Sequence, residues 1–426
     1  MLDIKFIREN TELVIQSLKN RNLNLDIAGL MAKDDERRKI LSKLEELRSQ
    51  RNKANDQISA LLKEKKDAKD KISSMKSISE EISLLEKSVK ELELDISKSL
   101  INIPNIPHSS VPVGAPKNNQ VVRSWGNLKK FNFKPLSHID IAQKLDIIDF
   151  NRATKITGSN FVLYKGQGAK LERALINFML DLHTKKHGYT EVFPPFLVNR
   201  ASMTGTGQLP KMEEDMYRLK EDDLFLIPTA EVPVTNIFRD EILEEKDLAI
   251  SYVAYSACFR REAGAYGKDT RGLIRVHEFN KVEMVKFAKP QDSYNQLERL
   301  VNDAEEVLKL LGIPYRVVML ATEDLSFAAS KCYDLEAYSP GVDKWLEVSS
   351  CSNFESFQAR RTNIRYRPQI KQSGKQATEY LHTLNGSGVA IPRTMASLIE
   401  NYQQSDGSIM IPEVLRGYMD GEERIS

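Results

Sequence analysis

Two heptad repeats near the N-terminus constrain the fold of this 426-residue chain more than any other feature. The second repeat covers residues 75–96, and every position of its seam is apolar. The first covers residues 40–61, and only Arg51 interrupts its seam. Alternating steps of three and four residues place one apolar stripe along each helix and favour supercoiling. Because a short polar stretch at residues 63–73 separates the repeats, we expect an antiparallel hairpin of helices, each ~45 Å long.

A change in composition marks the end of this helical part. Before the first proline there is only one glycine, and four prolines then follow within thirteen residues. Proline fixes φ and removes a backbone donor, so such a stretch is extended. We therefore predict an N-terminal helical arm at residues 1–105 with its coiled coil at about 36–100. A proline-rich linker at 106–120 and a second domain at 121–426 follow.

The charges are unevenly distributed along the predicted hairpin. The net charge of the whole chain is only +2, which disfavours a nucleic-acid partner on average. Residues 48–76, however, contain nine basic and four acidic side chains, whereas residues 80–95 contain six acidic and two basic ones. This basic end could bind phosphates, or it could be the solvated surface of a coiled coil. Charge alone leaves both interpretations open.

Cysteine and histidine usage excludes several classes of protein. The three cysteines lack metal-ligand spacing and are too few for a disulfide scaffold, and no HExxH is present, so we expect no zinc. The N-terminus contains Asp3, Glu9 and Glu12, which is unlike a signal or transit peptide. No apolar run approaches the ~20 residues of a membrane span. We expect a cytoplasmic protein with no membrane partner.

The remaining three hundred residues alternate helical segments with short strand-like runs. These runs lack regular βαβ spacing, so they favour an α+β domain with an antiparallel sheet flanked by helices. A Walker motif is absent, and Gly166 and Gly168 form only a lone GxG. The clearest strand-like runs are residues 224–228, 251–259, 282–287 and 315–320.

A predicted hairpin around residues 258–264 carries side chains suited to a nucleotide. Arg260 and Glu262 are two apart, so on a strand they share a face. The arginine could clamp a phosphate and the carboxylate could accept from an exocyclic amine. A loop at residues 265–270 follows, and we expect four more candidates on the returning strand: Arg271, Arg275, Phe279 and Glu283. Ordinary surface hairpins also contain such residues, so this segment alone is ambiguous.

Two further segments near the C-terminus suggest ligand contacts. We expect Glu347 and Ser349 on one face at a strand end, with Ser350 beside them, as oxygen donors for an ion such as Mg²⁺. Residues 384–393 read as a glycine-rich turn into a helix at 394–403. Its glycines allow a close approach of the backbone, and Arg393 stands at the helix start.

In this order, the segments resemble the class II aminoacyl-tRNA synthetases, and specifically the bacterial-type seryl-tRNA synthetases. The resemblance covers essentially the whole chain, the arm included. Motifs 1, 2 and 3 of that class correspond to residues 188–195, 259–283 and 386–393. Signatures of the serine enzymes stand at residues 204–210, 228–231, 347–350 and 382–388.

The resemblance implies a fold and a reaction. We expect a six- or seven-stranded antiparallel sheet and a homodimer with Pro195 at its interface. We expect ATP-dependent activation of L-serine to seryl-adenylate, followed by transfer to the 3′ end of tRNA(Ser), whose long variable arm the hairpin would grip. The family resemblance also raises tRNA(Sec) as a further substrate.

The resemblance also assigns roles to individual residues. Thr229, Ala230 and Glu231 would hold the serine ammonium, and Glu283 and Ser387 would meet its hydroxyl, with Asn385 nearby. Arg260, Glu283 and Arg393 would be the catalytic residues. The ATP contacts would come from Arg260, Arg261, Glu262, Arg275, Val276, Phe279, Glu347, Val348, Ser349, Ser350 and Arg393.

Within the ATP site, the expected roles are distinct. Arg260 would clamp the α-phosphate and the serine carboxylate, while Arg275 would reach the γ-phosphate. Glu262 would accept from the adenine amine, and two side chains would sandwich the base beside the Val276 backbone, namely Phe279 and Arg393. Mg²⁺ would bind to Glu347 and Ser350. At Arg261 many relatives carry serine, so its contact could be through the main chain alone.

Two alternatives remain at this point. A synthetase-like ligase could charge a carrier protein, although such a protein is expected to lack the long arm. A non-catalytic coiled-coil protein could retain a synthetase core, although loss of Arg260, Glu347 or Arg393 would then be expected, and all three are present.

Overall fold

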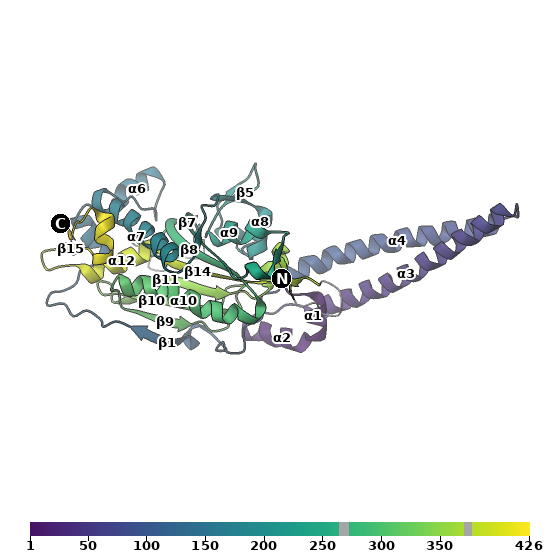
Figure 1. Cartoon of the computed structure of the whole chain (residues 1–426), viewed down its shortest axis with the longest axis horizontal. Coiled ribbons are helices and arrows are strands. Elements are labelled where there is room, and N and C mark those ends of the chain that lie inside the picture. The colour runs from purple at the N-terminus through teal and green to yellow at the C-terminus, as the bar shows by residue number, and fades with distance from the viewer. Residues whose placement is uncertain (264–271, 370–376) are drawn as a thin grey trace. The chain divides into compact units, whose positions relative to one another are not determined.

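A computed structural model describes residues 1–263, 272–369 and 377–426 of the chain. The predicted loop at residues 265–270 and the candidate Arg271 therefore lie outside the described residues. The chain divides into two compact units, Met1–Pro104 and Asn105–Ser426 (Figure 1).

The first unit, which the structure describes in full, contains four helices and no strand. Asp3 and Asp26 begin two of its helices, since their side chains accept hydrogen bonds from first-turn N–H groups. Asp34 is fully buried and pairs with Arg8 and, at 2.9 Å, with Arg37, which ties the first helix to the third. The four helices are α1 (Ile4–Glu9), α2 (Thr11–Asn20), α3 (Ile27–Lys63) and α4 (Lys69–Leu100).

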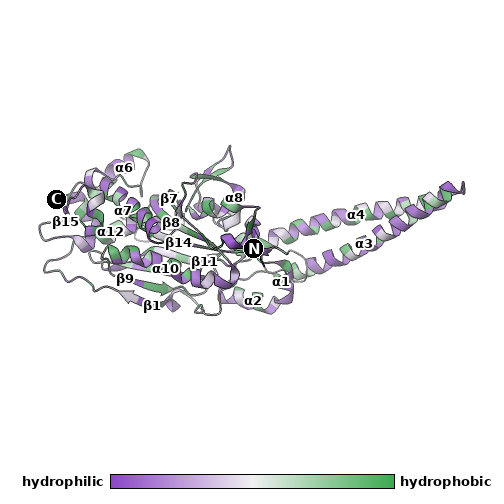
Figure 2. Cartoon of the chain, in the orientation of Figure 1, coloured by the Kyte–Doolittle hydropathy of each residue, from purple (hydrophilic) through white to green (hydrophobic). Residues whose placement is uncertain are grey.

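The helices α3 and α4 form the predicted antiparallel hairpin. Figure 1 shows them side by side along their length, and Figure 2 shows polar and apolar residues mixed along both. The seam residues Leu44, Leu47, Ile82 and Val89 are buried between them. The heptad prediction is thus confirmed, although α3 begins earlier than expected because Asp26 caps it. The connection between the helices is also shorter than residues 63–73.

The second unit is built on a sheet of eight strands in the order β1-β9-β10-β11-β14-β8-β7-β2. Every neighbouring pair is antiparallel except β2 and β7. The predicted α+β class is confirmed, but six or seven strands were too few because short strands add to both edges. The strands are β1 (Gln120–Trp125), β2 (Thr190–Glu191), β7 (Ile250–Phe259), β8 (Glu278–Ala288), β9 (Tyr315–Met319), β10 (Lys331–Ser339), β11 (Lys344–Asn353) and β14 (His382–Ala390).

The two faces of this sheet have different coverings. Three helices pack on one face and form the main core with residues such as Met284, Leu300 and Leu335. These helices are α7 (Gly166–Lys185), α10 (Ser293–Leu310) and α12 (Ile391–Tyr402). The opposite face packs Val285 and Phe287 against shorter elements, including α9 (Glu231–Thr235) and α11 (Phe357–Thr362).

The remaining short elements surround this frame. Three small sheets contain β3 (Leu197–Asn199), β5 (Leu224–Leu226) and β4 (Arg218–Leu219); β13 (Glu379–Tyr380), β12 (Arg365–Arg367) and β6 (Ile242–Glu244); and β15 (Ile409–Met410) with β16 (Arg424–Ile425). The other α-helices are α5 (His138–Lys144), α6 (Phe150–Ile156), α8 (Arg200–Thr206) and α13 (Glu413–Arg416). Within the described residues, no helix combines the length and the apolar character that crossing a membrane requires.

The proline-rich segment that begins the second unit forms hydrogen bonds with residues 322–330 of the same unit. Asn105 and His108 donate backbone hydrogen bonds to Phe327 (3.0 Å) and Ser330 (2.9 Å). Further along, the carbonyl of Pro112 accepts from the N–H of Thr322 at 2.9 Å. Proline lacks an N–H group, so its carbonyl is what remains for such contacts.

The predicted glycine-rich turn at residues 384–393 is instead the strand β14, and this prediction was wrong. Ladder hydrogen bonds to β8 and β11 on both sides outweigh the turn tendency of glycine. A Cβ on Gly386 would lie 2.7 Å from Cys351 Sγ, and one on Gly388 would lie 2.6 Å from His183 Nε2. The glycines therefore permit close packing within the sheet. The predicted helix follows as α12, which begins at Ile391.

Candidate active site

The strands β8 and β14 place the predicted serine-binding residues on one sheet face. Ser387 lies directly opposite Glu283 in the register, and residues two apart on a strand share a face. Asn385 and Lys281 therefore lie on the same face as this pair. The central strands thus bring together a carboxylate, a hydroxyl, an amide and an ammonium group.

Glu283 is the centre of a buried polar cluster. Its side chain is about 1 % exposed, and Lys281, itself buried, forms an ion pair with it. Asn385 Nδ2 donates to Oε1 at 3.2 Å, and Thr229 Oγ1 donates to Oε2 at 3.3 Å. Lys281 Nζ also donates to Thr229 Oγ1 at 2.9 Å. Sequence reasoning missed Lys281, although its spacing of two residues from Glu283 was a usable signal.

Glu231 lies in the first turn of α9, directly after the fully buried Ala230. Burial, together with the neighbouring Glu283, raises the pKa of its carboxyl group to about 7. Gln358 Nε2, from α11, donates to Glu231 Oε1 at 2.6 Å, and its Oε1 accepts from Thr383 at 2.7 Å. Sequence reasoning missed Gln358 as well, because nothing in its local sequence indicates a site so far away in the chain.

Arg260 follows β7 and lies beside both predicted ligand sites. Its Nε donates to the carbonyl of Pro228 at 3.3 Å, next to Thr229. Its guanidinium lies 5.1 Å from the ring centroid of Phe279 on β8. The backbone N–H donates to His277 at 2.8 Å, which closes this end of the strand pair. Arg260 thus connects the predicted serine and adenine sites.

The next residues of motif 2 are engaged with one another. Glu262 forms an ion pair with Arg275. The carboxylate and guanidinium groups that were expected to bind ATP therefore bind each other. Arg261 has an exposed side chain, and its backbone N–H donates to the carbonyl of Asp215 at 2.9 Å. Val276 is buried. A nucleotide would have to separate Glu262 from Arg275 to meet both of them.

A β-bulge corrects the predicted geometry of residues 347–350. Glu336 pairs with Glu347, but Leu335 pairs with Ser349, so the register shifts at Val348. The extra residue places Glu347 and Ser350 on one face, whereas Ser349 lies opposite a core residue. The prediction that Glu347 and Ser349 share a face was therefore wrong, as was their placement at a strand end. The side chains of Val348 and Ser349 are both buried.

Asp334 on β10 lies directly opposite Ser350, on the same face as Glu347. Burial, and then the charge of Glu347, raises the pKa of Asp334 well above its usual range. The Sγ atom of Cys332 lies 3.1 Å from Ser350 Oγ. Among the described residues, no three histidine, cysteine or acidic side chains form a metal-binding group. This arrangement nevertheless suits Mg²⁺, which commonly takes one or two carboxylates and completes its shell with phosphates and water.

Arg393 links three parts of this face. It lies in the first turn of α12, and its Nη1 donates to the carbonyl of Glu347 at 2.8 Å and to Oε2 at 3.2 Å. Its Nε donates to the carbonyl of Ile274 at 3.0 Å, one residue before Arg275. The helix α12, the strand β11 and the segment leading to β8 therefore meet at this guanidinium.

The chemistry of this face is that of binding and charge neutralisation. Three arginines, Arg260, Arg275 and Arg393, could stabilise a polyanion, and buried carboxylates beside them could hold an ammonium and a hydroxyl. Such a set suits phosphoryl-transfer chemistry, in which positioning and charge stabilisation dominate.

Two family models match the chain. Residues 1–107 match the model described as "Seryl-tRNA synthetase N-terminal domain". Residues 212–402 match the model described as "tRNA synthetase class II core domain (G, H, P, S and T)". The second range includes every residue discussed above for the two predicted ligand sites.

Full-length relatives and solved structures agree with these matches. The serine–tRNA ligase of Carboxydothermus hydrogenoformans is 55% identical over 426 residues, covering 100% of this chain and 99% of that protein. That of Geobacillus sp. (strain WCH70) is 56% identical, with 100% of both chains covered. The seryl-tRNA synthetase of Pyrococcus horikoshii, solved with ATP, is 38% identical with a TM-score of 0.93 and covers 100% and 99% of the two chains. This chain therefore belongs to the seryl-tRNA synthetase family of class II aminoacyl-tRNA synthetases, the serine–tRNA ligases.

Proposed function

We propose that the sheet face around Glu283 binds L-serine through the residues that the family resemblance assigned to it. The serine ammonium meets Glu231 and Thr229 beside Ala230, and the hydroxyl meets Glu283 and Ser387, with Asn385 already donating to Glu283. The observation that carries the proposal is the buried carboxylate pair. Burial raises the pKa of Glu231 to about 7, and a bound ammonium would offset that unfavourable burial.

We further propose that ATP lies along the arginines of the same face. Arg260 binds the α-phosphate, Arg275 the γ-phosphate and Glu262 the adenine amine, while Phe279 and Arg393 enclose the base. The ATP complex of the Pyrococcus relative supports ATP as the nucleotide, and the individual contacts follow the family resemblance. The Glu262–Arg275 ion pair then opens when nucleotide binds.

Mg²⁺ fits the oxygen donors that the bulge brings to one face. Glu347 and Ser350 would hold it, and it would neutralise phosphate charge there. Asp334 supports this placement, because burial and then the charge of Glu347 raise its pKa, and a cation bound beside these carboxylates would offset both effects.

The reaction follows as an in-line displacement. A serine carboxylate oxygen forms a bond to the α-phosphorus, and the bond from that phosphorus to the β-phosphate oxygen breaks, releasing pyrophosphate. Arg260 lies where it can hold both the attacking carboxylate and the α-phosphate, so its contribution is orientation and charge stabilisation. A ribose hydroxyl at the 3′ end of tRNA then attacks the seryl carbonyl and displaces AMP.

We propose tRNA(Ser) as the partner of the arm at residues 1–105, with residues 121–426 as the catalytic domain. The match of the first 107 residues to the seryl N-terminal model supports tRNA over a carrier protein. The tRNA(Sec) substrate stays a prediction from the resemblance. A homodimer through motif 1, with Pro195 at its interface, stays a prediction from the resemblance. A cytoplasmic location agrees with three free, buried cysteines.

ATP–pyrophosphate exchange with a panel of amino acids tests the proposed activation step. We expect exchange with serine and none with most others. Exchange with a different amino acid alone would overturn the assignment of the serine pocket. Glu231→Gln and Glu245→Gln are matched variants, because Glu245 is outside the proposed serine contacts, in a 3₁₀ helix at Glu245–Asp247, and forms an ion pair with Lys289. Only Glu231→Gln should raise KM for serine.

A further inference from the structure

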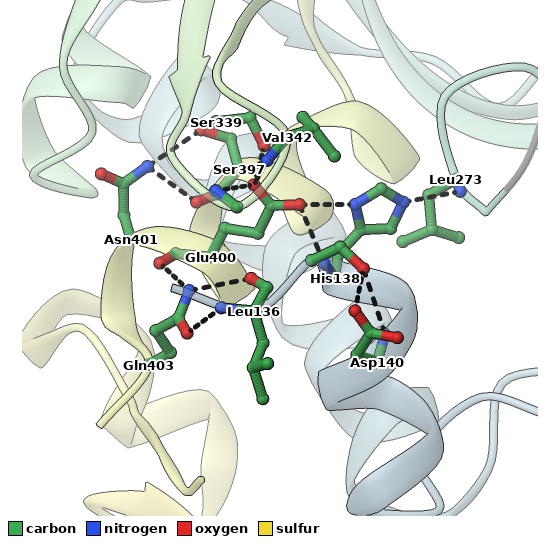
Figure 3. Close-up of polar contacts among 12 residues, drawn as sticks. Leu136, His138, Asp140, Leu273, Ser339, Val342, Ser397, Glu400, Asn401 and Gln403 are labelled. Carbon is green, nitrogen blue, oxygen red and sulfur yellow. Dashed lines mark hydrogen bonds and ion pairs between the residues drawn. The ribbon is translucent and has the colours of Figure 1, made fainter. Parts of the chain in front are cut away.

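A buried carboxylate on α12 lies outside the proposed ligand contacts and accepts an unusual number of hydrogen bonds. Glu400 Oε1 accepts from the backbone N–H and the Nδ1 of His138, at 2.8 and 2.7 Å. Its Oε2 accepts from Ser339 Oγ at 2.5 Å, and from the N–H groups of Gly341 and Val342 at 2.7 and 3.2 Å (Figure 3). The side chains of Glu400 and His138 are fully buried.

The second nitrogen of His138 accepts a hydrogen bond from the segment at residues 272–276. The N–H of Leu273 donates to His138 Nε2 at 3.2 Å, and Figure 3 shows the ring between Glu400 and Leu273. Because Nε2 accepts this bond, the proton of the neutral ring is on Nδ1, which donates to Glu400. The ring therefore links α12, through Glu400, to the backbone of Leu273 by two hydrogen bonds.

Gly272 shows how closely this segment approaches the ring. Its φ is +70°, and a Cβ there would collide with His138 Nε2 and the side chain of Ile139. Only glycine combines that backbone conformation with so little space. Gly272 and the Leu273 N–H therefore both lie against the His138 ring.

This network leads directly to the proposed ATP site. Leu273 precedes Ile274, whose carbonyl accepts from Arg393, and then come Arg275 and Val276. Glu400 lies on the same helix as Arg393. Its other partners, at residues 339–342, form the connection from β10 to β11, the strand that carries Glu347. Arg393 on α12 and the proposed ATP contacts at residues 275 and 276 are therefore joined through Glu400 and His138.

We propose that His138 and Glu400 are a positioning pair for ATP, which holds residues 272–276 in register with the start of α12. The inference rests on the proposed ATP site. A buried ionic group is weak evidence for a stabilising role, because apolar residues of similar volume often replace such groups without loss. Holding the ATP-binding groups in position gives a reason for the network, since a misplacement of about 1 Å at a binding group can lower a rate about 100-fold. Neither residue is among the proposed contacts to serine or ATP.

Two substitutions of His138 separate its two hydrogen bonds. His138→Asn places an amide nitrogen near the position of Nδ1. It keeps the donor to Glu400 but leaves the N–H of Leu273 without its acceptor. His138→Gln places an amide oxygen near Nε2, keeping the acceptor for Leu273. In serine-dependent ATP–pyrophosphate exchange, we expect His138→Asn to raise KM for ATP about tenfold, the effect of one net hydrogen bond. KM for serine should stay within about twofold. His138→Gln should raise KM for ATP less than His138→Asn, because it keeps the acceptor for Leu273 while the backbone N–H of residue 138 still donates to Glu400.

Ser339→Ala is the matched control, because it removes a donor to the same carboxylate without touching Leu273. It should lower the melting temperature and leave KM for ATP unchanged. Should His138→Asn not fold, Gly272→Ala tests the same contact from the other side, with the same expected rise in KM for ATP. Equal effects of Ser339→Ala and His138→Asn on KM for ATP would overturn the positioning role and show a merely structural network.

Arg393→Ala distinguishes failure of this inference from failure of the proposed site. If Arg393→Ala raises KM for ATP while His138→Asn and Gly272→Ala do not, the site stands and the positioning pair is wrong. If Arg393→Ala also has no effect, the proposed ATP site and the inference that rests on it are both wrong.

Discussion

The charged residues of the helical hairpin and those of the sheet face have opposite surroundings. On the hairpin, Lys63, Lys65 and Lys69 are exposed, and none of them forms an ion pair with a described residue. On the sheet face, Lys281 and Glu283 are buried and paired with each other. Each exposed charge contributes a weak electrostatic interaction that salt screens. A buried ion pair depends on exact geometry, and removing one partner costs much stability. The two regions should therefore respond differently to mutation, salt and pH.

The largest expected effect separates the two regions completely. Deleting residues 40–98 should abolish charging of tRNA, because it removes the basic end of the hairpin. Serine-dependent ATP–pyrophosphate exchange should stay within about twofold, since every residue of the proposed site remains. Aminoacylation and exchange measured on the same preparation check both halves. Charging that survives the deletion would contradict the tRNA-binding role of the hairpin.

The next effect tests the buried charges of the sheet face. Alanine lacks the hydroxyl proposed to bind Glu283, so its binding would leave a buried polar group unpaired. We expect activation of alanine to be weaker than that of serine by ~10⁴ or more. Threonine adds only a methyl group, which a pocket excludes by ~1–3 kcal/mol, so weak activation of threonine is expected. Comparable kcat/KM values for alanine and serine would rule out the hydroxyl-binding role of Glu283.

The same contrast explains what sequence could predict. The hairpin follows from a local period, because its seam residues need only each other, and Ile82 and Val89 lie where the heptads place them. The sheet face depends on register between strands far apart in the chain. The bulge at Val348 reversed the expected direction of Ser349, and Gln358 reaches Glu231 from another helix. Neither feature has a local sequence signal. Local pattern did single out Glu262, Glu283 and Glu347, whereas only the resemblance indicated Glu231.

A pH dependence should distinguish the buried carboxylates from the exposed cations. Burial and Glu283 raise the pKa of Glu231 to about 7, while Gln358, Lys281 and Arg260 lower it. Below this pH the carboxyl group is neutral and binds an ammonium poorly, and above it the ionised form binds well. KM for serine should therefore fall about tenfold from pH 6 to pH 8.

The control for this prediction is Glu231→Gln, which has no proton to lose. Its KM for serine should be higher than that of the wild type and should lack the fall between pH 6 and pH 8. A wild-type profile as flat as that of the variant would show that Glu231 does not meet the ammonium.

The smallest expected effect belongs to single cations of the hairpin. Lys63→Ala should weaken tRNA binding uniformly and reduce the slope of log K against log salt by about 1, because one phosphate contact releases about one counterion. Lys33→Ala is the matched control, since Lys33 lies on the same helix but pairs with Asp95 at 3.1 Å. Its salt slope should equal that of the wild type. Identical salt slopes for both variants would place the tRNA contact elsewhere on the hairpin. A large loss of tRNA affinity in Lys63→Ala alone would mean that this cation depends on precise geometry, as the buried residues do.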